Sequence, residues 1–222
     1  VFMRIKRDIV RNLKNIYWQL KGIGIFNLAP VLGLYVLIPL ANLAAYGMGH
    51  DMDYLYVNIV KQCQIFCPIL SVWYVIFVLE HCIEEPGNEL LYIRHRNKLP
   101  ELLLCYLAFQ ILLLPLFAVY TGMFPDLWWL YLKLCVIQLL YLGLAYFTAF
   151  LCRKITISVL AVLCYSISTV MAATIEVQGI SYYKVIVNQG TDLVRELIPF
   201  ALAAGVMLIG GCICNYYFPM RK

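Results

Sequence analysis

Six long apolar runs, separated by short polar stretches, set the pattern of the chain from residue 24 onward. A helix rises about 1.5 Å per residue, so about 20 apolar residues cross a hydrocarbon core that is about 30 Å thick. The pattern therefore predicts an all-α integral membrane protein with six transmembrane helices in a single domain, residues 1–222. The expected spans cover about residues 24–46, 57–79, 102–122, 127–151, 155–175 and 197–218.

The first 22 residues have a different pattern, in which apolar and basic positions fall largely on different faces of a helix. The apolar positions recur at steps of three and four, which is typical of an amphipathic helix lying in the membrane interface. A partly disordered basic tail is the alternative. No small-residue cleavage site follows a compact apolar core, so we expect mature protein rather than a secretory signal. The apolar positions are Phe2, Ile5, Ile9, Leu13, Ile16 and Leu20, and the basic ones are Arg4, Lys6, Arg7, Arg11 and Lys14.

Composition strengthens the membrane assignment. Hydrophobic residues make up 64% of the chain, charged residues make up 13%, and the mean hydropathy is +0.83. These values lie outside the range of soluble globular proteins. The nine cysteines lie mostly inside apolar runs, so we expect them to be small apolar side chains rather than a disulfide framework.

Lysine and arginine predict the orientation, because they collect on the cytoplasmic side of a membrane protein. With both termini in the cytoplasm, most of the 17 basic residues lie there, and the outer connections hold only Lys184 and Arg195. Lys61 and Lys133 fall near the outer ends of their spans, from which we expect their side chains to reach toward water. The net charge of +5 follows from this asymmetry, so we expect membrane lipids with anionic headgroups as neighbours and no nucleic acid.

Residues 176–196 form a long outer connection before the last expected span. They mix aromatic, β-branched and charged residues in a stretch that is too long for a turn and too polar for a span. We expect one or two short re-entrant or interfacial helices here, with a break at Asn188, Gln189, Gly190 and Thr191. A plain surface loop is the alternative.

Several polar or charged residues fall inside the expected spans. A charge at mid-bilayer costs about 2.5 to 3.5 kcal/mol on insertion scales, so such side chains face protein or water rather than lipid. We favour hydrogen bonding between helices as the interpretation for most of them. For Gln62, Gln64 and Ser168, contact with a substrate is an equal alternative. The set comprises Lys61, Gln62, Gln64, Lys133, Gln138, Ser166, Ser168 and Thr169.

Enzymatic chemistry has little support in the sequence. Glu84 and Glu85 stand together as in some intramembrane proteases, but no arginine follows the pair closely and no histidine follows His95. No serine stands in a glycine-flanked elbow, and no Gly-Lys pair is present to end a phosphate-binding loop. We therefore expect no catalytic residue and no nucleotide site on this chain.

A metal site formed by Cys63, Cys67, His81 and Cys82 is a further alternative. The first two residues lie one helical turn apart, but His81 lies about 20 Å further along a continuous helix. Ordinary packing is the better interpretation, so we expect no metal and no cofactor to be bound by this chain.

The stretch EEPGNELLYIRHRNKLP places charges of both signs between the second and third spans, in the connection of residues 80–101. A solvated loop, a catalytic cluster and a docking surface for another protein are competing interpretations. The predicted orientation puts this connection in the cytoplasm. The preference of basic residues for that side explains its arginines and lysine, but not three glutamates beside a Pro-Gly pair, so we favour docking.

The order of residues in this connection resembles the coupling loop of the type-2 ATP-binding-cassette (ABC) exporter permeases. In that family the pattern runs about Glu-Glu-x-Gly-Thr-x-Glu-Leu-Leu, followed by a short polar stretch with arginine. The layout is also similar, with a basic amphipathic helix, six spans and an outer excursion before the last span. Pro86 and Asn88 depart from the family pattern. The matching residues are Glu84, Glu85, Gly87, Glu89, Leu90 and Leu91.

The resemblance implies that these six residues form a coupling helix that contacts a cytoplasmic ABC ATPase subunit, on which ATP and Mg would be bound. It also implies a dimer of permease chains, identical or different, that exports its substrate by alternating access across a cell membrane, which we expect to be a bacterial plasma membrane. Spans two and five line the pathway in the family, which points to Gln64, Trp73, Tyr165 and Ser168. The 17 tyrosines and four tryptophans suit an amphipathic peptide, lipid or drug, and anchoring in the membrane interface explains many of them equally well. A six-span scaffold or immunity protein, which binds a partner without transport, is the alternative function.

Overall fold

The computed structural model describes residues 14, 21–22, 24–49, 51–84, 98–174, 182–184, 187 and 189–217. Within these ranges the chain is helical apart from short connections, and six helices are long and apolar enough to cross a membrane. The predicted all-α class and the six spans are confirmed at this level. The elements are η1 (Gly24–Leu28), α2 (Ala29–Leu32), η2 (Gly33–Leu37), α3 (Ile38–Gly49), α4 (Met52–Ile83), α6 (Leu99–Met123), α7 (Leu127–Cys152), α8 (Ile155–Thr174) and α9 (Gly190–Tyr216).

Two expected features lie largely outside the described residues. One is the interfacial helix of residues 1–22, of which the structure describes only Lys14, Lys21 and Gly22. The other is the coupling loop, of which residues 85–97 lie outside the described ranges. Both features therefore stay predictions.

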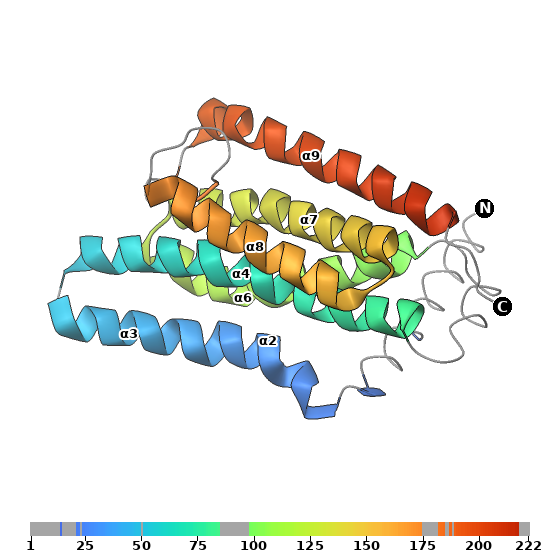
Figure 1. The fold of residues 1–222 in the computed structure, drawn as a ribbon. Helices are drawn as coiled ribbons and strands as arrows, with labels where there is room; N and C mark the ends of the chain where they lie inside the picture. Colours follow the sequence, from blue (N-terminus) through green and yellow to red (C-terminus); the bar gives the residue numbers. More distant parts are fainter. Residues whose placement is uncertain are drawn as a thin grey trace, which may run out of the picture.

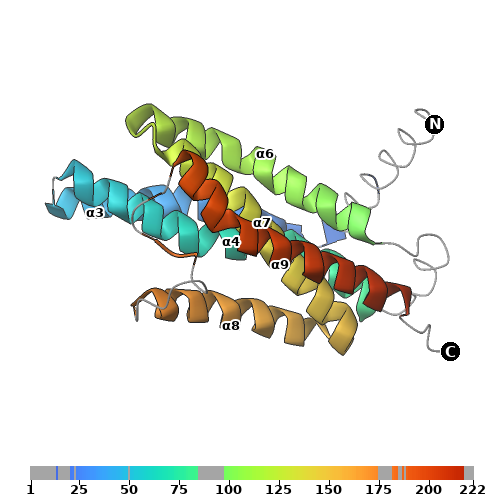
Figure 2. The same cartoon turned by 90° about the horizontal axis from the view of Figure 1, so that it is seen from above.

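The six spans run alternately in opposite directions, and η1, α2, η2 and α3 together form the first of them (Figure 1). α9 lies on one side of the bundle and the first span on the other, with α7 between them (Figure 1). Seen from above, α6 and α8 lie on either flank of α7 (Figure 2). Asp51 and Asp126 lie at one end, which we call the Asp51 end. Gly24, Glu84 and Tyr216 lie at the opposite end, which we call the Gly24 end.

The first span changes helix type along its length. A 3-10 turn, η1, leads into α2, and the π-helical segment η2 separates α2 from α3. Pro39 follows η2 and has no N–H to continue a regular helical hydrogen-bond pattern. Side chains of α4 bind the carbonyl oxygens of η1: Trp73 Nε1 donates to Phe26 O at 3.1 Å. The Tyr74 hydroxyl donates to Asn27 O at 3.0 Å, so α4 anchors the irregular start of this span.

α7 and α9 approach closely because small residues lie between them. A Cβ atom built at Gly211 would collide with the ring of Tyr146. One built at Gly143 would come within 3.1 Å of the carbonyl oxygen of Ala204. Close approach of this kind gives the dispersion contacts on which helix association in a bilayer depends. We call Gly143, Tyr146, Ala204 and Gly211 the α7–α9 seam.

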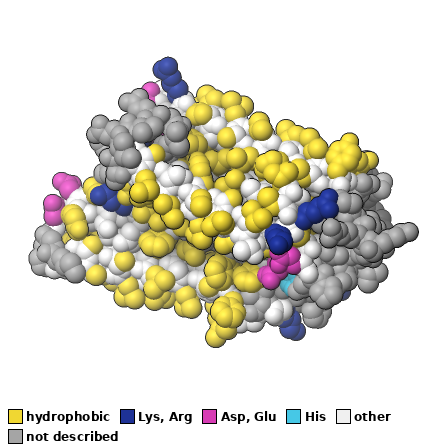
Figure 3. Space-filling model, viewed as in Figure 1, with side chains coloured by type: hydrophobic (Ala, Val, Ile, Leu, Met, Phe, Trp, Pro, Cys, Tyr) yellow, Lys and Arg dark blue, Asp and Glu magenta, His cyan; other side chains and the backbone are white. Residues whose placement is uncertain are grey.

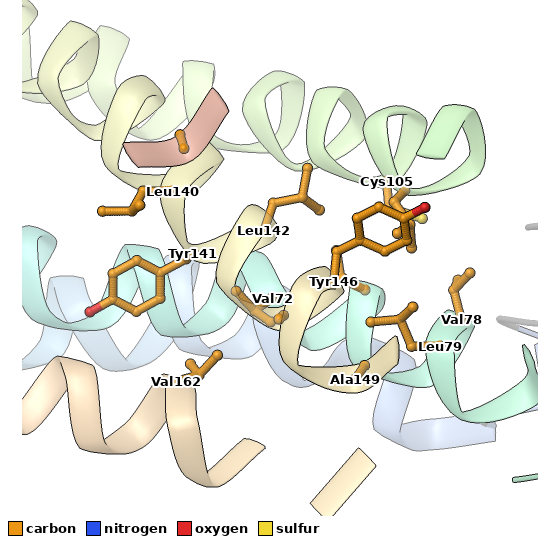
Figure 4. Close-up of a cluster of buried hydrophobic side chains, with 14 of the residues drawn as sticks. Val72, Val78, Leu79, Cys105, Leu140, Tyr141, Leu142, Tyr146, Ala149 and Val162 are labelled. Atoms are coloured by element: carbon orange, nitrogen blue, oxygen red, sulfur yellow. The ribbon is translucent and has the colours of Figure 1, made fainter. Parts of the chain in front are cut away.

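Buried apolar side chains fill the middle of the bundle, and α7 contributes more of them than any other described helix. Figure 4 shows the Tyr141 ring leaving α7 toward α8, from which Val162 points back, while Tyr146 lies on the side of Cys105. On the outer surface, apolar side chains cover the middle of the face in Figure 3, and charged side chains gather toward the two ends. This distribution is that of a bundle whose middle is surrounded by hydrocarbon.

α9 begins at Gly190 rather than near residue 197, so the last span is longer than predicted. Gly190 has a φ of 57°, a left-handed conformation that glycine adopts without strain, and Gln189 before it is extended. The break that the sequence predicts at 188–191 therefore coincides with the start of a membrane-spanning helix. As a consequence, Arg195 and Glu196 lie inside α9 rather than in the connection before it.

Candidate functional site

A groove between α8 and α9 is the candidate functional site. Its volume is about 290 Å³, and α7 forms its floor. Ala161 on α8 and Ala203 on α9 are small, so they leave the space that larger side chains would fill. The lining is apolar and aromatic, which suits an apolar chain or ring as a ligand. The lining residues are Leu140 and Leu144 from α7, Ala161 and Tyr165 from α8, and Pro199, Phe200, Ala203 and Met207 from α9.

Tyr182 packs against two of the residues that line the groove, Tyr165 and Phe200. Its side chain is only 2% exposed. The centroid of its ring lies 6.4 Å from that of Tyr165 and 6.3 Å from that of Phe200, so it contacts both walls of the groove. The Tyr141 ring lies beneath it, at 6.2 Å. Packing of aromatic rings at these separations is favourable. We call Tyr141, Tyr165, Tyr182 and Phe200 the aromatic cap.

The hydroxyl groups of the aromatic cap join three helices through hydrogen bonds. The Tyr141 hydroxyl lies 2.8 Å from Ser166 Oγ on α8 and 2.9 Å from the Tyr182 hydroxyl. The Tyr182 hydroxyl donates to the backbone oxygen of Gln64 on α4, at 3.2 Å. Burial raises the pKa of Tyr182, so its phenol stays neutral and keeps the proton that this bond requires.

Gln64 holds the segment that follows Tyr182 against α4. Its Nε2 donates to Lys184 O at 2.7 Å, and Lys184 N donates to Gln64 Oε1 at 2.9 Å. The buried side-chain amide thus pairs with a backbone amide in the way that a neighbouring strand would. We call Tyr182–Lys184 the strap, because this non-helical segment packs on groove residues through Tyr182 and is bound to α4.

Three charged side chains lie at the same end of the bundle. Lys133 Nζ on α7 lies 2.9 Å from Glu196 Oε1 on α9, and Lys184 Nζ on the strap lies 3.3 Å from Glu196 Oε2. The side chain of Lys133 is 0% exposed and that of Glu196 is 10% exposed, whereas that of Lys184 is 47% exposed. Both carboxylate oxygens therefore have a cationic partner, and we call the three residues the ion triad.

The predicted position of the Lys133 side chain is wrong. We expected this side chain to reach toward water from the outer end of its span, but it is buried. The reason is Glu196: α9 begins early enough to place this carboxylate beside the ammonium, and a buried charge needs such a partner. Sequence reasoning missed Glu196 because the residue was assigned to the outer connection. Glu196 precedes Pro199 by three residues and Phe200 by four, a spacing that could have indicated that it belongs to the same helix.

Two of the four predicted pathway residues meet at the strap, and two do not. Gln64 binds the strap, and Tyr165 both lines the groove and contacts Tyr182. Trp73 lies beside η1, where its indole donates to a backbone oxygen, and its ring packs 5.6 Å from that of Phe77. Ser168 is exposed on α8, and its hydroxyl donates to Cys164 O within the same helix, at 2.7 Å.

Other polar residues predicted to bond between helices also have partners in the bundle. Gln110 Nε2 on α6 donates to Gln138 Oε1 on α7, and both residues are buried. Ser166 bonds to Tyr141, as described above, whereas Thr169 donates to Ser166 O within α8. Lys61 is exposed on α4. Three of the eight residues, Lys133, Gln138 and Ser166, therefore join helices in the interior. Gln64 joins α4 to the strap.

Glu84 joins two helices at the Gly24 end. It is exposed and lies directly after α4, where its N–H bonds to Glu80 O at 2.9 Å. Its Oε1 accepts a hydrogen bond from the backbone N–H of Ile155, the first residue of α8, at 2.8 Å. A carboxylate at a helix N-terminus satisfies an unpaired N–H and interacts favourably with the helix dipole. The other predicted docking residues, Glu85, Gly87, Glu89, Leu90 and Leu91, lie outside the described residues.

Within the described part of the chain, no group of three or more His, Cys, Asp or Glu side chains lies where it could hold a metal ion. Comparison of the chain with protein-family models, with curated proteins and with solved structures finds no match. We therefore infer function from the groove, the packing of the strap beside it, and the contact that Glu84 makes with α8.

Proposed function

We propose that the chain is the membrane-spanning subunit of an ATP-driven exporter of the type-2 ABC permease kind. In this proposal an amphipathic substrate moves along the α8–α9 groove, and a separate ATPase subunit binds and hydrolyses ATP with Mg. The Gly24 end faces the cytoplasm. The resemblance of residues 84–91 to the coupling loop of that family motivates the proposal, and three features of the bundle support it.

The contact between Glu84 and Ile155 is the observation that carries the proposal. Glu84 opens the proposed docking segment, and its carboxylate binds the first residue of α8, which forms one wall of the groove. A partner that displaces this segment would therefore move α4 and α8 together. Motion of a rigid element attached to two helices is a recurrent way of transmitting a conformational change.

The packing of the strap beside the groove supports a mechanism of alternating access. Tyr182 packs on Tyr165 and Phe200 and is held by hydrogen bonds rather than by a covalent link. Individual bonds of this kind contribute about 1 kcal/mol each, so the energy of ATP hydrolysis on a partner is sufficient to break several of them. In the proposal, the strap moves away from the groove when substrate exits at the Asp51 end.

The distribution of charge supports the proposed orientation. Arg153 and Lys154 lie in the turn between α7 and α8, at the Gly24 end. Asp51, Asp53 and Asp126 lie at the opposite end, in and beside the short connections there. Basic residues favour the cytoplasmic side, whereas acidic residues carry little orientation signal. Arg153 and Lys154 therefore support the orientation, and Lys184 and Arg195 at the Asp51 end count against it.

A second permease chain, identical or different, completes the proposed transporter. The faces of α8 and α9 on either side of the groove carry exposed apolar side chains, among them Leu160, Ile167, Leu202 and Val206. A second chain placed over these faces would convert the groove into an enclosed pathway, as the resemblance implies.

To test the proposal, the full chain is co-expressed with ABC ATPases that are encoded near it and is purified in lipid nanodiscs. ATP hydrolysis by any ATPase that co-purifies is then measured. The variant Glu84→Arg reverses the charge at the proposed docking segment, and Asp53→Arg makes the same change at the other end of α4. We expect an ATPase to co-purify with the unaltered chain and with Asp53→Arg, and to be lost or uncoupled with Glu84→Arg. Absence of any ATPase, or an unaffected Glu84→Arg variant, would favour a scaffold that binds a partner without transport.

A further inference from the structure

We infer that the ligand of the α8–α9 groove is an anionic amphiphile, whose apolar chain lies in the groove and whose acidic head group binds at Lys184. This inference rests on the proposed function, because it names the class of substrate that the groove would carry. It is argued from the lining of the groove, from the position of the ion triad relative to it, and from the charge of that triad.

In the single chain, the groove can accept a hydrocarbon chain directly from the bilayer. It lies between α8 and α9, whose outward faces are apolar and exposed, so no polar barrier separates it from surrounding lipid. Its floor residues, Leu140 and Leu144, and the small Ala203 provide apolar contact along its length. Burying a methylene group against such a surface is favourable when the groove would otherwise be poorly filled.

The ion triad lies at the Asp51 end of the same groove, on the same helix faces. Glu196 precedes Phe200 by four residues, so the two share a face of α9 and lie about 6 Å apart along its axis. Lys133 precedes Leu140 by seven residues, which places it about two turns outward on the same face of α7. The distance from the groove to the triad thus matches the step from the chain to the head group of a single amphiphile.

The triad carries an excess of positive charge. Two ammonium groups, of Lys133 and Lys184, face the single carboxylate of Glu196. The shorter contact belongs to Lys133, at 2.9 Å, and that residue is fully buried. Lys184 is held at 3.3 Å and has 47% of its side chain exposed, so it is the cation that a head group can reach. An acidic head group would balance the remaining charge, whereas a cationic one would meet repulsion.

The test uses the purified full chain alone, in nanodiscs of zwitterionic phosphatidylcholine and without any ATPase. The probe is a long-chain fatty acid with a photoreactive diazirine at the chain end, compared with its uncharged methyl ester. After illumination, mass spectrometry locates the labelled residues. We expect the acid to label the groove residues of α8 and α9 more strongly than the ester does. Equal labelling by acid and ester, or labelling confined to other helices, would overturn the inference.

Two variants separate the head-group contact from the groove. Lys184→Gln should reduce labelling by the acid about fivefold, the effect of losing one exposed charge pair, and should leave the ester unchanged. Lys154→Gln, which removes an exposed charge at the Gly24 end, is the control and should change neither. Ala203→Phe fills the groove and should reduce both labels while the chain remains monodisperse. Undiminished labelling of Lys184→Gln by the acid would contradict the role of Lys184.

These outcomes are distinguishable from failure of the proposed function. Labelling is measured on the chain without a partner, so its failure would remove the anionic ligand and leave ATPase coupling untouched. Failure of an ATPase to co-purify would remove the exporter and leave a lipid-binding groove.

Discussion

Lys133 on α7 and Glu196 on α9 form an ion pair of 2.9 Å inside a bundle whose outer surface is apolar in its middle. The pair sits at the Asp51 end, and the α7–α9 seam joins the same two helices farther toward the Gly24 end. α7 and α9 are therefore held by charge at one end and by close packing along the rest of their contact. The two kinds of contact predict different responses to substitution.

Removal of Glu196 should destabilise the bundle more than removal of both charges. Glu196→Ala leaves Lys133 buried without its carboxylate, and loss of one partner of a buried pair costs about 3 kcal/mol or more. The double variant Lys133→Met with Glu196→Leu replaces the pair by apolar side chains of similar size and should recover much of that loss. Thermal unfolding in detergent measures both. Lys61→Met, at an exposed lysine of α4, serves as the control and should unfold like the unaltered chain.

Gln64→Leu should release the strap. It removes two hydrogen bonds to the backbone of Lys184, each worth about 1 kcal/mol, so the amide of Lys184 should exchange its hydrogen roughly 30-fold faster. Hydrogen exchange followed by mass spectrometry measures this rate.

Gln62→Leu is the matched control, because Gln62 lies two positions earlier on α4 and its Oε1 has no hydrogen-bond partner in the described structure. This variant should leave exchange of the strap unchanged. Protection of the Lys184 amide that survives in Gln64→Leu would mean that the ion triad and the hydrogen bonds of Tyr182 hold the strap without the side chain of Gln64.

Gly211→Val should disrupt the α7–α9 seam. A Cβ atom at this position collides with the ring of Tyr146, and overpacking of this kind costs about 1 to 3 kcal/mol. Gly205→Ala, on the same helix but with open space around its Cα, should be neutral or slightly stabilising because alanine favours the helix. Unfolding temperatures compare the two. A combined Gly211→Ala and Tyr146→Leu variant should be more stable than Gly211→Ala alone, if the ring is the obstacle.

Glu84→Gln and Glu84→Ala should separate helix capping from charge. Glutamine keeps an oxygen that can accept from the N–H of Ile155, whereas alanine removes it and should lower stability by about 1 kcal/mol. Exchange of the Ile155 amide should therefore rise in Glu84→Ala and change little in Glu84→Gln. If the exchange rate of the Ile155 amide rises equally in both variants, the charge, and not the hydrogen bond, stabilises the start of α8.

The six spans could be predicted from the sequence because each is a long apolar run, and hydrocarbon imposes helical structure on such runs. The start of α9 could not, because Arg195 and Glu196 make the segment too polar to resemble a span until Lys133 is known to lie beside it. Helix ends that are stabilised by a distant partner carry little local signal.

The candidate site was predictable only in part, for a related reason. Gln64 stood out as a polar residue inside a span, and it does hold the strap, but its partner is the backbone of Lys184, which no side-chain pattern reveals. The groove depends on the small side chains of Ala161 and Ala203 facing each other across α7. The sequence does not show that these two alanines line the same groove, because that depends on how α8 and α9 pack.

Pro199 makes α9 easier to bend at one point within the helix. It lies inside the helix and has no N–H, so the carbonyl of Arg195 lacks its usual helical donor and the helix is weakest at this turn. The ion triad lies on one side of that point and the α7–α9 seam on the other. A bend of α9 at Pro199 would move the part of the helix before Pro199 outward and leave the part after Pro199 packed on α7. Opening the Asp51 end would then require the loss of the ion triad, the amide pair of Gln64 and the hydrogen bonds of Tyr182, with the rest of the bundle left in place.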